Sequence, residues 1–173
     1  MIDRVLIDSL NLKARDFAVR WKDLIRGAPH LKHYQTMDDD TLIEADKRFY
    51  PLLARTLDRG MDRSLIGDAF VRLGKERMRG GFPVSEVIYG ISLIQKVVIE
   101  FLTNEFAPDN PMRMYQSMGA LTKIAEFFLL GSFYMTKGYL EETYTSMSTH
   151  DKVSEDFLKK YFKDDFFFKK ELN

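Results

Sequence analysis

The chain has 173 residues, of which 45% are hydrophobic and 30% are charged, a composition typical of one folded domain and not of a disordered segment. Lysine plus arginine and aspartate plus glutamate number 26 each, so the chain lacks the basic excess that phosphate binding needs, and we expect no nucleic-acid partner. It has no cysteine, which excludes disulfides, thiolate metal sites and a cysteine nucleophile.

The hydropathy pattern gives no sign of a signal peptide or a membrane span. Charged residues interrupt the N-terminal stretch too early for a signal peptide. The longest uncharged stretch of the helical region covers residues 127–136, whereas a membrane-spanning helix needs about 20 apolar residues. We therefore expect a soluble, cytoplasmic protein with no membrane partner.

The first predicted helix covers residues 3–26, where apolar side chains recur at mostly helical spacing, and Gly27 ends it. A polar connection over residues 27–40 follows. In it, His30 and His33 are spaced by one helical turn and precede three aspartates. A metal site there is one interpretation, but zinc sites usually need three or four ligands, so we favour a solvated loop and expect no metal.

The second predicted helix covers residues 42–59. Thr41 and Glu44 have the spacing of a capping box, in which each side chain bonds a free backbone N–H at the helix start. Pro51 removes one backbone donor. We therefore expect this helix to kink or split near Tyr50.

The third predicted helix is capped by Asp62 and ends near Arg79, and residues 80–83 form a tight turn. The fourth covers residues 84–102, with the cleanest apolar periodicity of the chain, so it should be central to the core. Arg77 lies where the third helix meets the turn. We expect its cation to bond the carbonyls at the helix end, and the alternative is a contact with an anion or a partner.

The fifth predicted helix covers residues 112–147, with Pro111 suited to its first position and Gly131 and Gly138 as weak points. At about 1.5 Å per residue it would be about 54 Å long, which exceeds the width of a small domain. It should therefore protrude, bend at a glycine or pair with another chain. A homodimer is our expectation.

Aromatic side chains crowd the fifth helix. They could line a pocket for an apolar ligand, although such a stripe is more often core or a dimer interface, and the single tryptophan, Trp21, is a packing residue by default. The aromatic residues are Phe127, Phe128, Phe133, Tyr134, Tyr139 and Tyr144.

No constellation for catalysis or cofactor binding is found. The chain has no histidine between His33 and His150, so the long helices lack the usual haem ligand, and no helix places a histidine beside a hydroxyl nucleophile. No glycine-rich phosphate loop is present. We therefore expect a protein that is not an enzyme and has no cofactor.

The sequence predicts a helical domain over residues 1–149 and an amphipathic helix or tail over residues 150–173. The helix, over residues 151–168, either folds back onto its own domain or docks onto a partner protein. Its neutral charge favours a protein over a membrane as the partner. The candidate partner-binding residues are Phe157, Leu158, Tyr161, Phe162 and Phe166.

Residues 73–88 read LGKERMRGGFPVSEVI, a helix ending in an arginine, a glycine turn, a short run after a proline, and the start of a long apolar helix. With the RWKDLI stretch around Trp21, this pattern resembles the N-terminal sensory domain of the RsbR-type, or RsbT co-antagonist, family of bacterial stress regulators. The resemblance extends over about residues 10–147. The residues that match are Arg77, Gly81, Pro83, Glu86, Val87 and Ile88.

The expected fold is an all-α, compact bundle of five to six helices, and the resemblance implies a globin-like arrangement without haem, usually dimeric. In the family a sulfate-transporter/anti-sigma-antagonist (STAS) domain commonly follows. Residues 150–173 have no alternating strand–helix pattern, so we expect the output domain to be missing or to belong to another protein. The leading hypothesis is a non-catalytic regulatory or sensory module of bacterial stress signalling that dimerises and binds a STAS-type or kinase protein. The alternative is a carrier with an apolar cavity.

Overall fold

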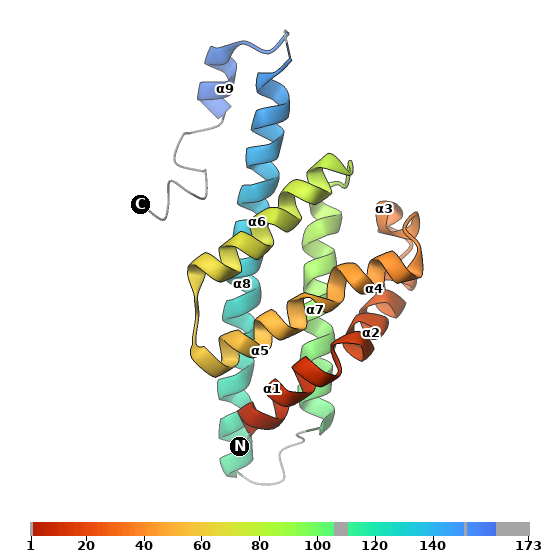
Figure 1. The fold of residues 1–173 in the computed structure, drawn as a ribbon, viewed down its shortest axis with the longest axis vertical. Helices are drawn as coiled ribbons and strands as arrows, with labels where there is room; N and C mark the ends of the chain where they lie inside the picture. Colours follow the sequence, from red (N-terminus) through yellow and green to blue (C-terminus); the bar gives the residue numbers. More distant parts are fainter. Residues whose placement is uncertain (1, 106–110, 151, 162–173) are drawn as a thin grey trace. The chain divides into compact units, whose positions relative to one another are not determined.

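The computed structural model describes residues 2–105, 111–150 and 152–161, and every regular element in these ranges is a helix (Figure 1), which confirms the all-α fold. The globin-like arrangement stays a prediction. The helices in chain order are α1 (Ile2–Leu12), α2 (Ala14–Arg26), α3 (Lys32–Gln35), α4 (Asp39–Lys47), α5 (Phe49–Arg59), α6 (Arg63–Arg79), α7 (Val84–Glu105), α8 (Pro111–Ser148) and α9 (Glu155–Tyr161).

The chain divides into two compact units. Unit 1 contains residues 1–62 and 88–129, and unit 2 contains residues 63–87 and 130–173. Both α7 and α8 contribute residues to each unit. The boundary that the sequence predicts between residues 149 and 150 is a different division, and it stays a prediction.

In unit 1, α1 packs on α5 and α2 packs on α4 (Figure 1). The predicted single helix over residues 3–26 is wrong, because the backbone of Lys13 has φ −108° and ψ 20° and separates α1 from α2. The predicted helix over residues 42–59 is likewise divided at Arg48, close to the expected break near Tyr50. Because both predicted helices are broken, α1 can pack along α5 while α2 packs along α4.

The connection over residues 27–40 is ordered by hydrogen bonds and contains the short helix α3. The Arg26 guanidinium donates to the backbone oxygens of Tyr34 (3.2 Å) and Met37 (2.6 Å) and to Oδ1 of Asp39 (2.7 Å). The connection is therefore more ordered than the solvated loop that the sequence predicts, because the half-buried Arg26 guanidinium can bond several carbonyls at once.

The start of α4 is capped by Asp38, and the predicted capping box of Thr41 with Glu44 is wrong. Asp38 Oδ1 accepts the Thr41 backbone N–H at 2.8 Å, and Asp38 Oδ2 accepts the Thr41 hydroxyl at 2.6 Å. These bonds lower the pKa of Asp38. An aspartate one turn earlier satisfies one of the free N–H groups, so the helix begins at Asp39 and not at residue 42.

The tryptophan of α2 holds that helix against α7 within unit 1. Trp21 Nε1–H donates to the Gly90 carbonyl oxygen at 2.9 Å, and the side chain is buried. A Cβ on Gly90 would lie 2.9 Å from the Tyr34 hydroxyl oxygen, so the glycine makes room for that ring. Trp21 is thus the packing residue that the sequence predicts. The apolar period of residues 84–102 also includes Ile88, and its expected place in the core is wrong, since that side chain is 40% exposed.

In unit 2, α6 ends in the turn that leads to α7. The Phe82 N–H donates to the Arg77 carbonyl and the Gly81 N–H to the Met78 carbonyl, both at 3.0 Å, which is the Schellman pattern. Gly81 has φ +74°, a conformation that other residues adopt only with strain. Pro83 follows because it cannot continue the helix.

Also in unit 2, α6 and α8 touch through their backbones at two glycines. A Cβ on Gly74 would lie 2.1 Å from the Met135 carbonyl oxygen, and one on Gly138 would lie 2.2 Å from the Val71 carbonyl oxygen. Gly138 is therefore a packing position, and the expectation of a weak point is wrong, because α8 runs unbroken through it. The length of α8 confirms the predicted fifth helix.

Charged side chains flank this crossing. Lys75 Nζ lies 2.6 Å from a carboxylate oxygen of Glu141, and Arg79 makes two hydrogen bonds, of 2.8 and 2.9 Å, to Glu142. The Arg79 hydrogen bonds lower the pKa of Glu142. Both pairs join α6 to α8 beside the glycine contacts.

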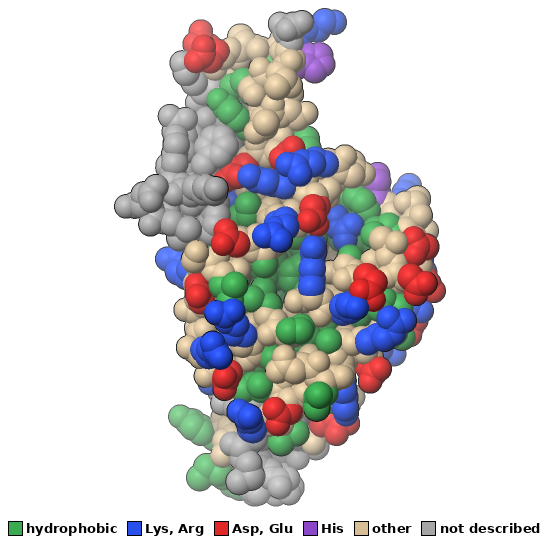
Figure 2. All heavy atoms as spheres, in the orientation of Figure 1, with side chains coloured by type: hydrophobic (Ala, Val, Ile, Leu, Met, Phe, Trp, Pro, Cys, Tyr) green, Lys and Arg blue, Asp and Glu red, His purple; other side chains and the backbone are tan. Residues whose placement is uncertain are grey.

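The surface mixes both signs of charge. On the face drawn in Figure 2, acidic and basic side chains are interspersed and apolar side chains lie between them. Within the described residues, none of the helices combines the length and the hydrophobicity that a membrane crossing requires.

Candidate functional site

The predicted partner-binding residues of the tail are not brought together by the part of α9 that is described. Ser154 caps α9, since its Oγ accepts the Phe157 N–H at 3.2 Å. Leu158 is only 4% exposed, whereas Phe157 is 44% exposed. The side chain of Tyr161, and Phe162 and Phe166, lie outside the described residues. Leu158 thus packs as a core residue, and docking by the tail stays a prediction.

The turn residues Arg77, Gly81 and Pro83 have structural surroundings. The Arg77 guanidinium carbon lies 4.8 Å from the centroid of the Phe82 ring, a cation–π contact. The carbonyls of Arg77 and Met78 accept backbone N–H groups of the turn. One contact that Arg77 makes across the turn is therefore with an aromatic face.

The aromatic side chains of α8 are divided between core and surface. In unit 1, the rings of Phe127 and Phe128 are buried and lie 5.1 Å apart, edge to face. In unit 2, Tyr134 is fully buried and its hydroxyl accepts from Arg63 Nε at 3.1 Å, while Phe133 is about half exposed. The buried rings are thus packing residues, and the carrier with an apolar cavity stays a prediction.

A row of exposed side chains lies along α8 in unit 1, and we call Tyr115, Met118, Thr122 and Leu129 the α8 seam. Spacings of three, four and seven residues place them on one side of the helix. Tyr115 is 77% exposed and Leu129 is 72% exposed. The opposite side of the same part of α8 is buried, with Ala120, Ile124, Phe127 and Phe128.

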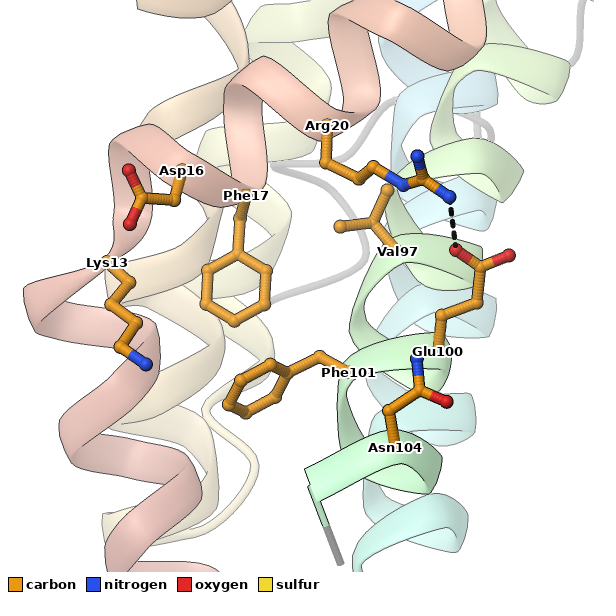
Figure 3. A pocket seen from close by; sticks show the side chains of 8 residues that line it. All are labelled: Lys13, Asp16, Phe17, Arg20, Val97, Glu100, Phe101 and Asn104. Carbon is orange, nitrogen blue, oxygen red and sulfur yellow. Dashed lines mark ion pairs between the residues drawn. The ribbon is translucent and has the colours of Figure 1, made fainter.

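A surface groove of about 300 Å³ lies between α2 and α7 in unit 1 (Figure 3). Four lining residues come from α7, and the other four come from α2 and the residue that precedes it, Lys13. Both sets have the sequence spacing i, i+3, i+4 and i+7. The lining residues are Lys13, Asp16, Phe17, Arg20, Val97, Glu100, Phe101 and Asn104.

Two phenylalanines form the floor of this groove. The rings of Phe17 and Phe101 lie 4.9 Å apart, edge to face, and Phe17 also stacks on Tyr50 at 5.1 Å. The Tyr50 hydroxyl donates to Oδ2 of the buried Asp46 at 2.6 Å. Burial, with the nearby Asp46 charge, raises the pKa of Tyr50. The floor thus rests on a fixed buried pair.

Charged side chains form the walls of the groove. Arg20 and Glu100 pair with each other at 3.6 Å on one side of the rings (Figure 3). Lys13 and Asp16 lie on the other side, and Lys13 Nζ is 5.8 Å from the centroid of the Phe101 ring. The lining carries two cations and two anions, so its formal net charge is zero.

Neither the groove nor the exposure of the seam residues follows from sequence reasoning. The apolar period assigns Phe17 and Phe101 to the core face of their helices. It does not show whether these faces of α2 and α7 close on each other or leave a groove between them. The signal that could have marked the groove is a phenylalanine with a charged residue at i, i+3, i+4, i+7 spacing, which occurs both in residues 13–20 and in residues 97–104.

The two histidines of the polar connection, His30 and His33, line neither the groove nor a metal site in the described residues. The His30 ring packs edge-on against Tyr89, with centroids 4.9 Å apart. Across residues 2–105, 111–150 and 152–161, no group of three or more acidic, histidine or cysteine side chains is placed to hold a metal ion.

Comparisons of the chain with protein-family models, with curated proteins and with solved structures found no match. The resemblance of residues 73–88 to the RsbR-type family therefore stays a prediction. The dimer, the STAS-type or kinase partner and the absence of enzyme activity stay predictions with it.

Proposed function

We propose that this protein is a non-catalytic regulatory interaction module that forms a homodimer through the α8 seam. The observation that carries the proposal is the division of α8 in unit 1 into a buried side and an exposed side that carries the large apolar side chains of Tyr115, Met118 and Leu129. Exposed apolar surface of this kind on a folded protein commonly marks an interaction site. Tyrosine and methionine, which provide much of the seam, are enriched in the cores of protein interfaces.

The occupant that fits the seam best is a second copy of it. The four seam residues carry no charge, so none of them repels its counterpart when two seams meet. Spacings of three and four residues let side chains of one helix fit between those of another. A two-fold axis then uses the same patch on both copies, which is the commonest symmetry of homo-oligomers.

The regulatory part of the proposal rests on the resemblance of residues 73–88 to the RsbR-type sensory domain. In that role the dimer would transmit a signal to a separate STAS-type or kinase protein. The non-catalytic part rests on the sequence, which offers three histidines, no cysteine and no nucleophile–base pattern.

Sedimentation of the full chain over a range of concentrations tests the dimer. We expect Leu129→Glu to raise the dimer dissociation constant at least about 30-fold, since burying an unpaired charge in an interface core costs about 2 kcal/mol or more. Leu12→Glu is the matched control, because Leu12 is an exposed leucine of unit 1 on α1, outside the seam.

The control variant should sediment like the unmodified protein. Circular dichroism should show unchanged helix content for both variants, since both sites are exposed. A monomer at every concentration, or equal weakening by both substitutions, would contradict the proposal.

A further inference from the structure

We propose that the groove between α2 and α7 binds a small zwitterionic molecule with a large apolar side chain, of the kind of a hydrophobic α-amino acid. This activity goes beyond self-association through α8. It makes the groove the place where a metabolite would act on the protein.

The floor of the groove provides an apolar contact that is already in place. Phe17 is held between Phe101 and Tyr50, at 4.9 and 5.1 Å. Tyr50 is anchored by its 2.6 Å hydrogen bond to Asp46. A ligand side chain that lies on Phe101 and Val97 therefore meets a surface that does not need to rearrange, which lowers the entropic cost of binding.

The walls provide one cation and one anion that are available to a ligand. Within the described part of the chain, neither Lys13 nor Asp16 takes part in an ion pair, whereas Arg20 and Glu100 pair with each other. Lys13 directly precedes α2, and Asp16 lies in the first turn of that helix. Both lie on the same side of the aromatic floor (Figure 3).

This arrangement selects for a ligand that carries both charges on neighbouring atoms. The ammonium group would pair with Asp16 and the carboxylate with Lys13, which leaves the apolar side chain to cover Phe101. A simple anion would meet two carboxylates of the lining, and a simple cation would meet two basic groups. Specificity in such a site comes from these unfavourable pairings as well as from the attractive ones.

The volume sets the size of the ligand. A groove of about 300 Å³ holds roughly ten water molecules at about 30 Å³ each, at the lower end of the range for small-molecule sites. An amino acid fits this size better than a peptide or a drug-sized molecule does.

The test is an NMR titration of the full chain with three compounds that share a phenyl ring. Phenylalanine carries both charges, phenethylamine only the cation, and 3-phenylpropanoate only the anion. Backbone amides of residues 13–20 and 97–104, with the side-chain amide of Asn104, report the site. We expect saturable shifts with phenylalanine, and binding about fivefold weaker for each of the other two, since one exposed ion pair contributes up to about 1 kcal/mol.

Substitutions assign each wall to one group of the ligand. Lys13→Met should weaken phenylalanine binding about fivefold and leave phenethylamine binding unchanged, and Asp16→Asn should weaken phenylalanine and leave 3-phenylpropanoate unchanged. Phe101→Ala should abolish saturable shifts with all three. The matched controls are Lys152→Met and Asp68→Asn, exposed charges of unit 2, and neither should change any titration.

The three compounds also define the results that overturn the proposal. No saturable shift with phenylalanine would remove the site. Equal affinity for all three would show an apolar surface without charge selection, and tightest binding of 3-phenylpropanoate would show an anion site instead. Dimerisation is read separately by sedimentation, so either proposal can fail without the other.

Discussion

Replacing Gly74 by alanine tests the backbone contact between α6 and α8 in unit 2. The added Cβ would lie 2.1 Å from the Met135 carbonyl oxygen and 2.7 Å from the Tyr139 backbone nitrogen. Ordinary contact needs about 3.5 Å between such atoms, so roughly 1 Å of separation is missing. Because the obstructing atoms are backbone, no side chain can rotate away, and the helices must move apart.

The magnitude follows from two opposing terms. Alanine is favoured over glycine in a helix interior by about 1 kcal/mol. Overfilling a packed core costs about 1–3 kcal/mol, and a clash with backbone belongs at the upper end. We expect Gly74→Ala to lower the free energy of unfolding by about 2 kcal/mol, which corresponds to a fall in Tm of about 4–8 °C for a chain of this length.

The control is Gly119→Ala, also in the middle of a helix. A Cβ there would meet no atom within 4 Å, so only the helix propensity changes and stability should rise by up to about 1 kcal/mol. Both variants are compared by urea unfolding followed by circular dichroism, at a concentration low enough for the monomer. If Gly74→Ala were as stable as the unmodified protein, or if the two variants moved in the same direction, the close crossing of α6 and α8 would be refuted.

Three further predictions concern buried and paired groups. Tyr50→Phe should cost about 1–3 kcal/mol in urea unfolding because it leaves a buried carboxylate without its hydroxyl partner, and no loss would contradict the pair. Burial raises the pKa of Tyr50 in the folded protein, so the Tyr50 hydroxyl contributes fully to the free energy of unfolding below its unfolded pKa, near 10.0. This contribution is lost as the pH rises through the folded pKa, so this loss of stability should begin only above about pH 10.0. The pKa of Glu142 is lowered by Arg79, so its contribution is present above about pH 4.5 and lost as the pH falls; Glu142→Gln should flatten the acid limb of the stability curve, and an unchanged limb would contradict this. Leu158→Ala should cost about 2–3 kcal/mol and the exposed Phe157→Ala under about 1 kcal/mol, and equal thermal stability of the two variants would show that α9 contributes nothing to its unit.

The longest helices were within reach of sequence reasoning because their signals are local. An apolar period near 3.6 predicts a helix wherever it occurs, and a glycine or proline at its end predicts a stop. The prediction of residues 112–147 for the fifth helix corresponds to Pro111–Ser148, and that of Asp62 to Arg79 for the third corresponds to Arg63–Arg79. Local composition also predicted the divided helix before Pro51, since a proline acts on its own helix.

The candidate site was out of reach for the opposite reason. The apolar period assigns Phe17 and Phe101 to the core side of their helices, although charged residues lie one turn away from each. Whether two such faces close on each other or leave a groove depends on the angle and distance between the helices. No property of either segment alone contains that information.

The sequence by itself therefore determined the helical class, the neutral charge and the positions at which most helices end, because these depend on residues close together in the chain. The tertiary structure alone decided the break at Lys13, the close approach at Gly74, and the exposure of one side of α8. Each of these depends on which helix packs against which. The sequence does not distinguish a glycine that weakens a helix from one that lets a second helix backbone come close. The structure does, because it places the Met135 carbonyl oxygen 2.1 Å from the position that a Cβ on Gly74 would take.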